Sequence, residues 1–308
     1  METPEAIRHA GKEDEAPFAE LKALLDEQLR ERQPEGERTL RIGSAGVRVA
    51  YAGESARRYV EEHARLYWTD AAPLVTVRVV SCDAFPVGRV RESTLWQGDG
   101  QAHLGRWDFF IELDAASHSA RAVVAPAAEF VSVDSAVRVA IGAFVAPEHC
   151  VLLHGMASVR DGVGVIGSAL GRGGKSTSAR LLRAQGWTTL CDDLPAIHEE
   201  KREFIVSGTP FWSCREEDFH TDRFTTERVP LRAVFLLEKG RTVEVIPCER
   251  PQATATLMRN VLHYPMEEAL GVAKLECVLR LVGRVPVFRL SFLRDELPED
   301  VILKQVHQ

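Results

Sequence analysis

The 308-residue sequence lacks several features, and each absence excludes a class of protein. No apolar run approaches the roughly 20 residues of a membrane-spanning helix, since the longest covers only residues 139–146. Residues 1–14 hold four acidic side chains and no sustained apolar segment, which predicts that no signal peptide is present. We therefore expect a cytoplasmic protein that does not bind membranes.

Paired cysteines and excess basic charge are also missing. None of the six cysteines belongs to a Cys-x-x-Cys pair, and Cys150 with His154 lacks a second ligand pair, so reduced thiols are predicted rather than zinc or disulfides. The net charge of -7 argues against a general nucleic-acid binder, because phosphate neutralisation needs a basic face. The cysteines are at positions 82, 150, 191, 214, 248 and 277.

What the sequence does contain is enough apolar material, 45%, for a large core, and its length predicts two folded units. Apolar residues at helical spacing predict a helix over about 17–32, which either docks on a partner or packs on its own domain. They are Phe18, Leu21, Leu25 and Leu29. We divide the chain into a helix and linker over 1–36, a β-rich domain over 37–148 and a second domain over 149–308.

Extended patterns dominate residues 39 to about 130, with a helical stretch over 54–67. A second helix is expected to begin at a cap, Ser132 or Asp134, to end before Pro147, and to pack onto the following domain. The expected strands cover residues 40–42, 47–51, 75–80 and 109–113.

The second domain is expected to open with a hairpin. Apolar strands over 151–159 and 163–168 flank Asp161-Gly162, a preferred two-residue turn. Pairing outward from that turn places His154 opposite Ala169, so a histidine is predicted at the mouth of the loop that follows.

That loop, residues 167–177, reads Gly-Ser-Ala-Leu-Gly-Arg-Gly-Gly-Lys-Ser-Thr and joins the strand to a helix. Its amides, the Lys175 ammonium and the Ser176 hydroxyl suit a polyphosphate with magnesium. Ala169 stands where the strict pattern has glycine, and Arg172 either touches phosphate or points into solvent. The predicted nucleotide-binding residues are Gly171, Arg172, Gly173, Gly174, Lys175, Ser176 and Thr177.

Two adjacent acids follow the next strand. The helix after Lys175 is expected to end at Gly186, and the strand over 187–191 leads into Asp192-Asp193. A strand–helix–strand unit brings both carboxyl ends to one sheet edge, so the acids are expected to face the loop. One would face the metal and the other the acceptor, with the assignment open at this point.

Beyond the acids, a hairpin of residues 194–197 and 204–206 is expected to return residues 208–211 beside them, as a structural turn or facing the substrate. The remaining elements are expected to be strands over 233–237, 243–246 and 287–292 and helices over 253–262 and 267–282.

Four motifs together resemble the catalytic core of the HPr kinase/phosphorylase superfamily, over about residues 149–210. They are Leu153-His154-Gly155, Gly162-Val163-Gly164-Val165, Gly174-Lys175-Ser176 and Asp192-Asp193. The resemblance implies an α/β (α+β) fold, with a mixed-sheet P-loop kinase core related to HPr kinase and phosphoenolpyruvate carboxykinase. It makes residues 149–308 an HPr-kinase-like nucleotide-binding domain.

The resemblance also implies roles for individual residues in an ATP-dependent kinase that phosphorylates a hydroxyl. Lys175 would hold the β and γ phosphates, Ser176 and Asp193 would bind Mg²⁺, Asp192 would act on the acceptor hydroxyl, and His154 would assist. The implied acceptor is a serine of a protein or peptide, or a small molecule, and homo-oligomers are common in the family.

Three departures from the family pattern keep other functions open. Ala169 replaces a loop glycine, the first domain differs from that of the founding enzymes, and no C-terminal Gly-rich signature follows residue 211. A non-catalytic, nucleotide-responsive binding module is therefore the second hypothesis. A carboxykinase-like enzyme is the third, although no carboxylate-binding arginine is identifiable.

Overall fold

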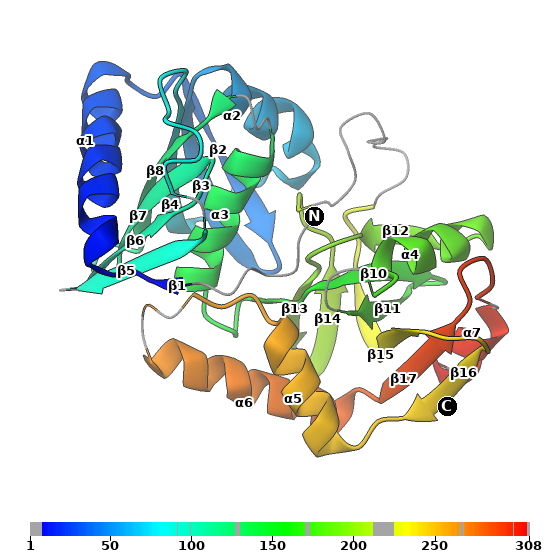
Figure 1. Cartoon of the computed structure of the whole chain (residues 1–308). Coiled ribbons are helices and arrows are strands. Elements are labelled where there is room, and N and C mark those ends of the chain that lie inside the picture. Colours follow the sequence, from blue (N-terminus) through cyan, green and yellow to red (C-terminus); the bar gives the residue numbers. More distant parts are fainter. Residues whose placement is uncertain are drawn as a thin grey trace.

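A computed structural model describes the arrangement of most of the chain (Figure 1). The described residues are 8–90, 92–98, 100–126, 130–169, 173–211, 225–264, 266, 268–297 and 299–306. They form two mixed sheets, one from each half of the sequence, with helices on their faces. The expected mixed α/β class is therefore confirmed.

The first sheet has the strand order β1-β5-β6-β7-β8-β4-β3-β2. Four of its strands match the predicted ones, whereas β1, β5, β6 and β8 were not expected. The strands are β1 (Arg8–His9), β2 (Gly36–Ile42), β3 (Ala45–Ala52), β4 (Pro73–Ser81), β5 (Thr94–Gly98), β6 (Gln101–Gly105), β7 (Phe109–Asp114) and β8 (Ser119–Val124). The helical stretch over 54–67 is broken into α2 (Glu54–Arg58), a π-helical turn (Tyr59–His63) and a 3-10 turn (Arg65–Tyr67).

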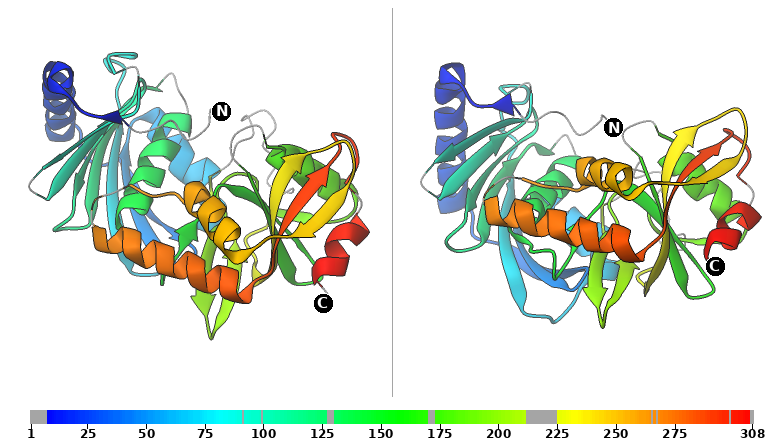
Figure 2. Two further views of the ribbon diagram at one scale, coloured as in Figure 1. Left: turned by 60° about the horizontal axis from the view of Figure 1, so that its bottom comes forward. Right: turned by 90° about the horizontal axis from the view of Figure 1, so that it is seen from below.

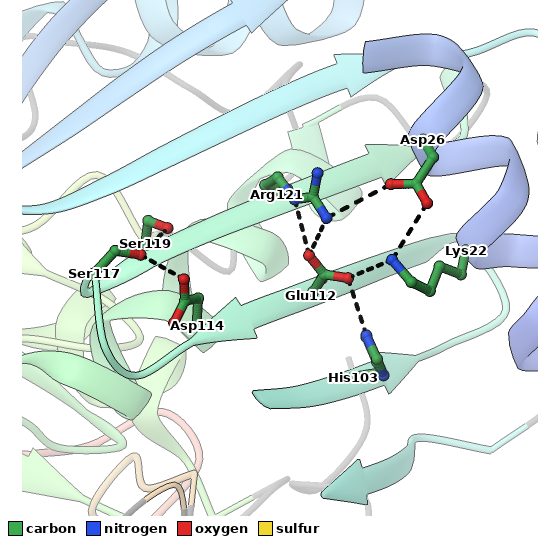
Figure 3. Close-up of polar contacts among 8 residues, drawn as sticks. All are labelled: Lys22, Asp26, His103, Glu112, Asp114, Ser117, Ser119 and Arg121. Carbon is green, nitrogen blue, oxygen red and sulfur yellow. Dashed lines mark hydrogen bonds and ion pairs between the residues drawn. The ribbon is translucent and has the colours of Figure 1, made fainter. Parts of the chain in front are cut away.

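Helix α1 (Glu15–Glu31), which follows a 3-10 turn (Lys12–Asp14), lies along one face of this sheet (Figures 1 and 2). Its apolar stripe packs on Val80, Phe110 and Val123, and Lys22 donates to buried Glu112 at 2.8 Å (Figure 3). The α1 stripe therefore packs on its own domain.

Helix α3 (Phe130–Phe144) covers the opposite face together with α2. Val137 and Ile141 pack into the first sheet's core, and Gly142 on the same helix lies against Tyr264 and Leu262, so the helix packs on both the first sheet and the second domain. The predicted caps are wrong, because both residues lie inside the helix. Ser132 donates to Asp108 Oδ2 at 2.7 Å, and Asp134 pairs with Arg138.

The second sheet has the order β12-β10-β11-β15-β14-β13-β9, with β17 beside β15 and β16 beside β17. Alternate residues of β15 face opposite layers: Phe235 packs toward α4 and α7, and Val234 toward α5 and α6. Its strands are β9 (Val151–Leu152), β10 (Gly155–Arg160), β11 (Val163–Ser168), β12 (Thr188–Cys191), β13 (Ala196–Glu200), β14 (Glu203–Ser207), β15 (Arg228–Lys239), β16 (Glu244–Pro247) and β17 (Val287–Phe292). Its helices are α4 (Lys175–Ala184), α5 (Arg250–Asn260), α6 (Glu268–Arg284) and α7 (Glu299–Val306), of which α7 was not expected.

The strand predicted over 151–159 is split at His154. Leu153 N donates to Pro195 O at 3.2 Å and His154 N to Asn260 O at 2.7 Å, so the backbone there leaves one ladder before joining the next. The split divides β9, which pairs with β13, from β10, which pairs with β11 and β12. Among the described residues, no helix is both long and apolar enough to cross a bilayer.

Candidate phosphate site

The β10–β11 hairpin aligns the first part of the site. Asp161 and Gly162 have φ values of 52° and 76°, the pattern of a type I′ turn, and Gly155 pairs with Ser168 in the predicted register. His154 therefore lies one residue beyond the ladder, and its carbonyl accepts a hydrogen bond from Ser168 Oγ at 2.7 Å. The predicted hairpin register is confirmed, and it places His154 beside the end of β11.

Strand β12 brings the two acids to the same edge. It pairs antiparallel with β10, which also pairs antiparallel with β11, so β12 and β11 run in the same direction with β10 between them. The Asp193 carbonyl accepts a hydrogen bond from Gly155 N at 2.8 Å. The carboxyl end of β12 thus lies near His154, at the same sheet edge as the carboxyl end of β11.

The loop after β11 leads into α4 through Gly174, whose φ of 99° suits glycine. A Cβ there would approach Phe292 Cζ to 2.8 Å. Gly173 and Thr177 are half-buried and Ser176 is exposed at the start of the helix. Gly171 and Arg172 lie outside the described residues, so their predicted contacts remain predictions.

A hydrogen bond joins Lys175 to Ala169, at the two ends of this loop. The Ala169 side chain is buried in the core that α4 covers, while its carbonyl accepts a hydrogen bond from Lys175 Nζ at 3.1 Å. The backbone at Ala169 is not in the left-handed region, so alanine fits where the strict pattern has glycine.

Asp193 is buried between two basic side chains. Arg138, on α3 of the first sheet, donates from Nη1 to Oδ2 at 2.8 Å. His154 Nδ1 lies 3.7 Å from Oδ1, too far for a hydrogen bond but close enough for attraction when the ring is protonated. Burial acts to raise the pKa of Asp193, but Arg138 and His154 outweigh it and hold the pKa well below its usual value. Asp193 is therefore an ionised carboxylate.

Arg138 is shared between two carboxylates. Its Nη2 lies 2.6 Å from Asp134 Oδ2, and its guanidinium carbon lies 5.1 Å from the centre of the Phe211 ring. Tyr59 donates to Asp134 Oδ1 at 3.2 Å. Burial raises the pKa of Asp134 to about 6. The positive charge of Arg138 acts to lower this pKa, and the negative charge of Asp193 acts to raise it. The first sheet therefore contributes a buried charged cluster to the site.

Asp192 is also largely buried, 7% exposed, and follows a thiol that stays protonated. Burial, and then the charge of Asp192, raises the pKa of Cys191 to about 12. Cys191 therefore supplies neither a thiolate nucleophile nor a metal ligand at neutral pH, and Asp192 is the reactive candidate at this end of β12.

The buried side-chain amide of Asn260 contacts the end of β11, where the loop begins. Asn260, the last residue of α5, donates from Nδ2 to Ser168 Oγ at 2.9 Å, and its carbonyl accepts the His154 amide. Asn260 and Arg138 were both missed by sequence reasoning. An Asp134–Arg138 pair one turn apart in an apolar helix was a usable signal for Arg138, whereas nothing local marked Asn260.

The segment 208–211 is a buried structural turn. Thr209 Oγ1 donates to Leu194 O at 2.8 Å, and a Cβ on Gly208 would approach Leu190 O to 2.4 Å. The predicted hairpin before it is confirmed as β13 and β14, joined at Lys201 and Arg202. The substrate-facing alternative finds no support in these contacts.

The oxygen donors at this edge fit magnesium chemically. Within the described part of the chain, no group of three or more His, Cys, Asp or Glu side chains is placed to hold a metal. A nucleotide-bound Mg²⁺ needs only one or two carboxylates besides phosphate oxygens, and Ser176 with the aspartates supplies such donors. Both oxygens of Asp193, however, already face basic side chains.

Two cavities lie away from this edge. One, of about 230 Å³, is lined by the start of α1 with Trp96 and His103, and the other, of about 360 Å³, adjoins the Asp161–Gly162 turn. Neither is lined by Lys175 or the two aspartates.

Comparison with known proteins gives one family match. The family described as "SynChlorMet cassette protein ScmC" matches residues 125–294, which include α3 and every candidate site residue. No curated protein matches the chain. Among solved structures, the HPr(Ser) kinase/phosphatase from Coxiella burnetii is 15% identical, with 50% of this chain and 91% of that chain covered and a TM-score of 0.26. So distant a likeness leaves the chemistry to be argued from the residues themselves.

Proposed function

This chain belongs to the family of the SynChlorMet cassette protein ScmC, and we propose that the matched region is an ATP-dependent kinase that phosphorylates a hydroxyl group. The family description states no chemistry, so the proposal rests on the site. The observation that supports it is that β11, which leads toward the glycine–lysine helix start, and β12, which leads into Asp192-Asp193, run in the same direction with His154 at that sheet edge.

These groups match the needs of phosphoryl transfer. Amides at the start of α4 and the Lys175 ammonium would stabilise the negative charge of the β and γ phosphates. Bound Mg²⁺ would neutralise phosphate charge further, with Ser176 and Asp193 as candidate ligands.

Asp192 would accept the proton of the acceptor hydroxyl. The acceptor oxygen then forms a bond to the γ phosphorus, the bond from that phosphorus to the β–γ bridging oxygen breaks, and ADP leaves with the electron pair. Asp193, ionised beside His154 and Arg138, would hold the histidine in place next to the reacting groups.

The test is transfer of labelled γ phosphate from ATP to a library of serine-containing peptides and hydroxylated small molecules. Asp192→Asn should reduce transfer by about 100-fold to 10,000-fold, the usual contribution of a general base. The matched control is Asp161→Asn, because the Asp161 side chain is 86% exposed in the β10–β11 turn. This substitution should leave phosphate transfer unchanged. Equal transfer by Asp192→Asn and the wild type would remove Asp192 from the mechanism.

A non-catalytic, nucleotide-responsive module is the second candidate, favoured by the Arg138–Asp193 contact between the site and the first sheet. It predicts nucleotide binding in calorimetry without transfer to any acceptor. A wild-type protein that binds neither ATP nor ADP contradicts both candidates.

A further inference from the structure

Arg138 reaches the site from the other sheet of the molecule. It lies on α3, whose Val133, Val137 and Ile141 pack against the first sheet, yet its guanidinium donates to Asp193 on the second. The arginine is buried, with only 12% of its side chain exposed, and is held at 2.6 Å by Asp134. A cation from the first sheet therefore occupies an oxygen that a metal would use.

We propose, on the basis of the proposed function, that Arg138 occupies Asp193 in place of magnesium and that a magnesium nucleotide exchanges the guanidinium for the metal. Arg138 is then a positioning residue whose contact with Asp193 depends on the state of the site. The exchange would couple nucleotide binding to α3 and so to the first sheet.

The charges on the two sides of this contact make the exchange feasible. Oδ2 of Asp193 accepts a hydrogen bond from the Arg138 guanidinium at 2.8 Å, whereas His154 lies 3.7 Å from Oδ1, so a cation that binds through Oδ2 competes directly with Arg138. Arg138 can leave without becoming an unpaired buried charge, because Asp134 remains its partner. Asp193 in turn exchanges one cation for another, so neither carboxylate is left without a counter-charge.

Asp134 sets the balance of the exchange. It draws Arg138 away from Asp193 and adds negative charge near the metal position, and both effects favour the metal. Removing that carboxylate should shift the balance toward the guanidinium. Changes at Arg138 and Asp134 therefore have opposite expected signs.

The experiment is calorimetric ATP binding over a series of Mg²⁺ concentrations, with the Mg²⁺ midpoint as the readout. Arg138→Gln should lower the midpoint at least fivefold, Arg138→Lys should stay near the wild type, and Asp134→Asn should raise it. The matched control is Arg78→Gln, which removes an arginine of the same sheet that donates to Leu29 O and Arg32 O. That control should leave the midpoint unchanged.

Hydrogen exchange across residues 130–144 gives a readout that does not depend on turnover. In the wild type, exchange should rise with ATP and Mg²⁺ but not with ATP and EDTA, and Arg138→Gln should abolish the difference. A midpoint that is unchanged or raised in Arg138→Gln overturns the inference. If that variant does not fold, an unchanged or lowered midpoint in Asp134→Asn overturns it.

Failure of the proposed function gives a different pattern. If the wild type binds no nucleotide, the kinase proposal fails, and the role of Arg138 is decided by Mn²⁺ binding measured by electron paramagnetic resonance without nucleotide. Tighter Mn²⁺ binding in Arg138→Gln supports the exchange, whereas equal binding overturns it.

Discussion

Glu112 shows how a single carboxylate can organise one face of the first sheet (Figure 3). It accepts hydrogen bonds from Lys22 at 2.8 Å, from Arg121 Nε at 2.8 Å and from His103 at 3.1 Å. Burial acts to raise the pKa of Glu112, but these three donors lower it to about 2. The cluster therefore keeps an ionised carboxylate between α1 and the strands.

Glu112→Gln should lower the free energy of unfolding by about 2–3 kcal/mol at pH 7, because the ionised carboxylate is lost. The lowered pKa means that this stabilisation is present above about pH 4.5 and is lost as the pH falls toward 2. Urea unfolding from pH 7 to pH 3 should show a shallower loss in the variant than in the wild type.

The control for Glu112 is Asp26→Asn. Asp26 contacts the same two basic side chains, Lys22 and Arg121, but its side chain is 40% exposed. Asp26→Asn should therefore lower the free energy of unfolding by less than about 1 kcal/mol. Equal losses in the two variants would contradict the importance assigned to burial.

The relative positions of some candidate site residues could be predicted because those residues belong to local motifs. His154, Lys175 and Asp193 could be placed because a hairpin turn and a strand–helix–strand unit fix their positions over short stretches of chain. Arg138 could not, since its contact with Asp193 depends on how α3 lies on a different sheet.

At the element scale, α1 depends on its buried stripe. Leu21 is fully buried against the first sheet, so Leu21→Ala should lower the free energy of unfolding by about 2–5 kcal/mol through lost burial and a cavity. Leu24→Ala is the matched control, because Leu24 is only partly buried on the same helix. This substitution should lower the free energy of unfolding clearly less than Leu21→Ala does. Chemical unfolding of both variants is the measurement, and equal losses would contradict this account of α1 packing.

Elements with strong local signals were predictable, and those defined by distant partners were not. The β10–β11 register followed from the Asp161-Gly162 turn, and Gly186, with a φ of 90°, ends the α4 segment as expected. The split at His154 was missed because it is fixed by hydrogen bonds to Pro195 and Asn260, far along the chain. Alternating apolar residues cannot reveal such a change of ladder.

At the scale of the whole molecule, Lys274 ties α6 of the second sheet to α3 of the first. Its buried ammonium donates to Gly142 O at 2.7 Å and to Leu262 O at 3.3 Å. Burial lowers the pKa of Lys274 to about 8, so the folded protein binds this proton more weakly than the unfolded chain. The ammonium therefore joins the two halves at a cost in desolvation.

The pH dependence of stability should reveal that cost. Between about pH 8 and pH 10.5, the unfolded chain keeps the lysine proton that the folded state loses, so Lys274 makes stability rise with pH, on the order of 3 kcal/mol over the window. Lys274→Met should remove this contribution, whereas Lys304→Met, at an exposed position of α7, should retain it. The measurement is the difference in unfolding free energy between each variant and the wild type, and parallel curves for Lys274→Met would refute the assignment.

The hydrogen bond from Lys175 to the Ala169 carbonyl has a consequence for ligand choice. Any molecule that recruits this ammonium must outcompete an uncharged peptide oxygen already in place. An oxyanion gains from the substitution, because it adds the attraction between opposite charges to a hydrogen bond whose donor is already charged. An alcohol or amide offers no such gain. The Lys175–Ala169 hydrogen bond therefore disfavours the binding of uncharged ligands through this ammonium.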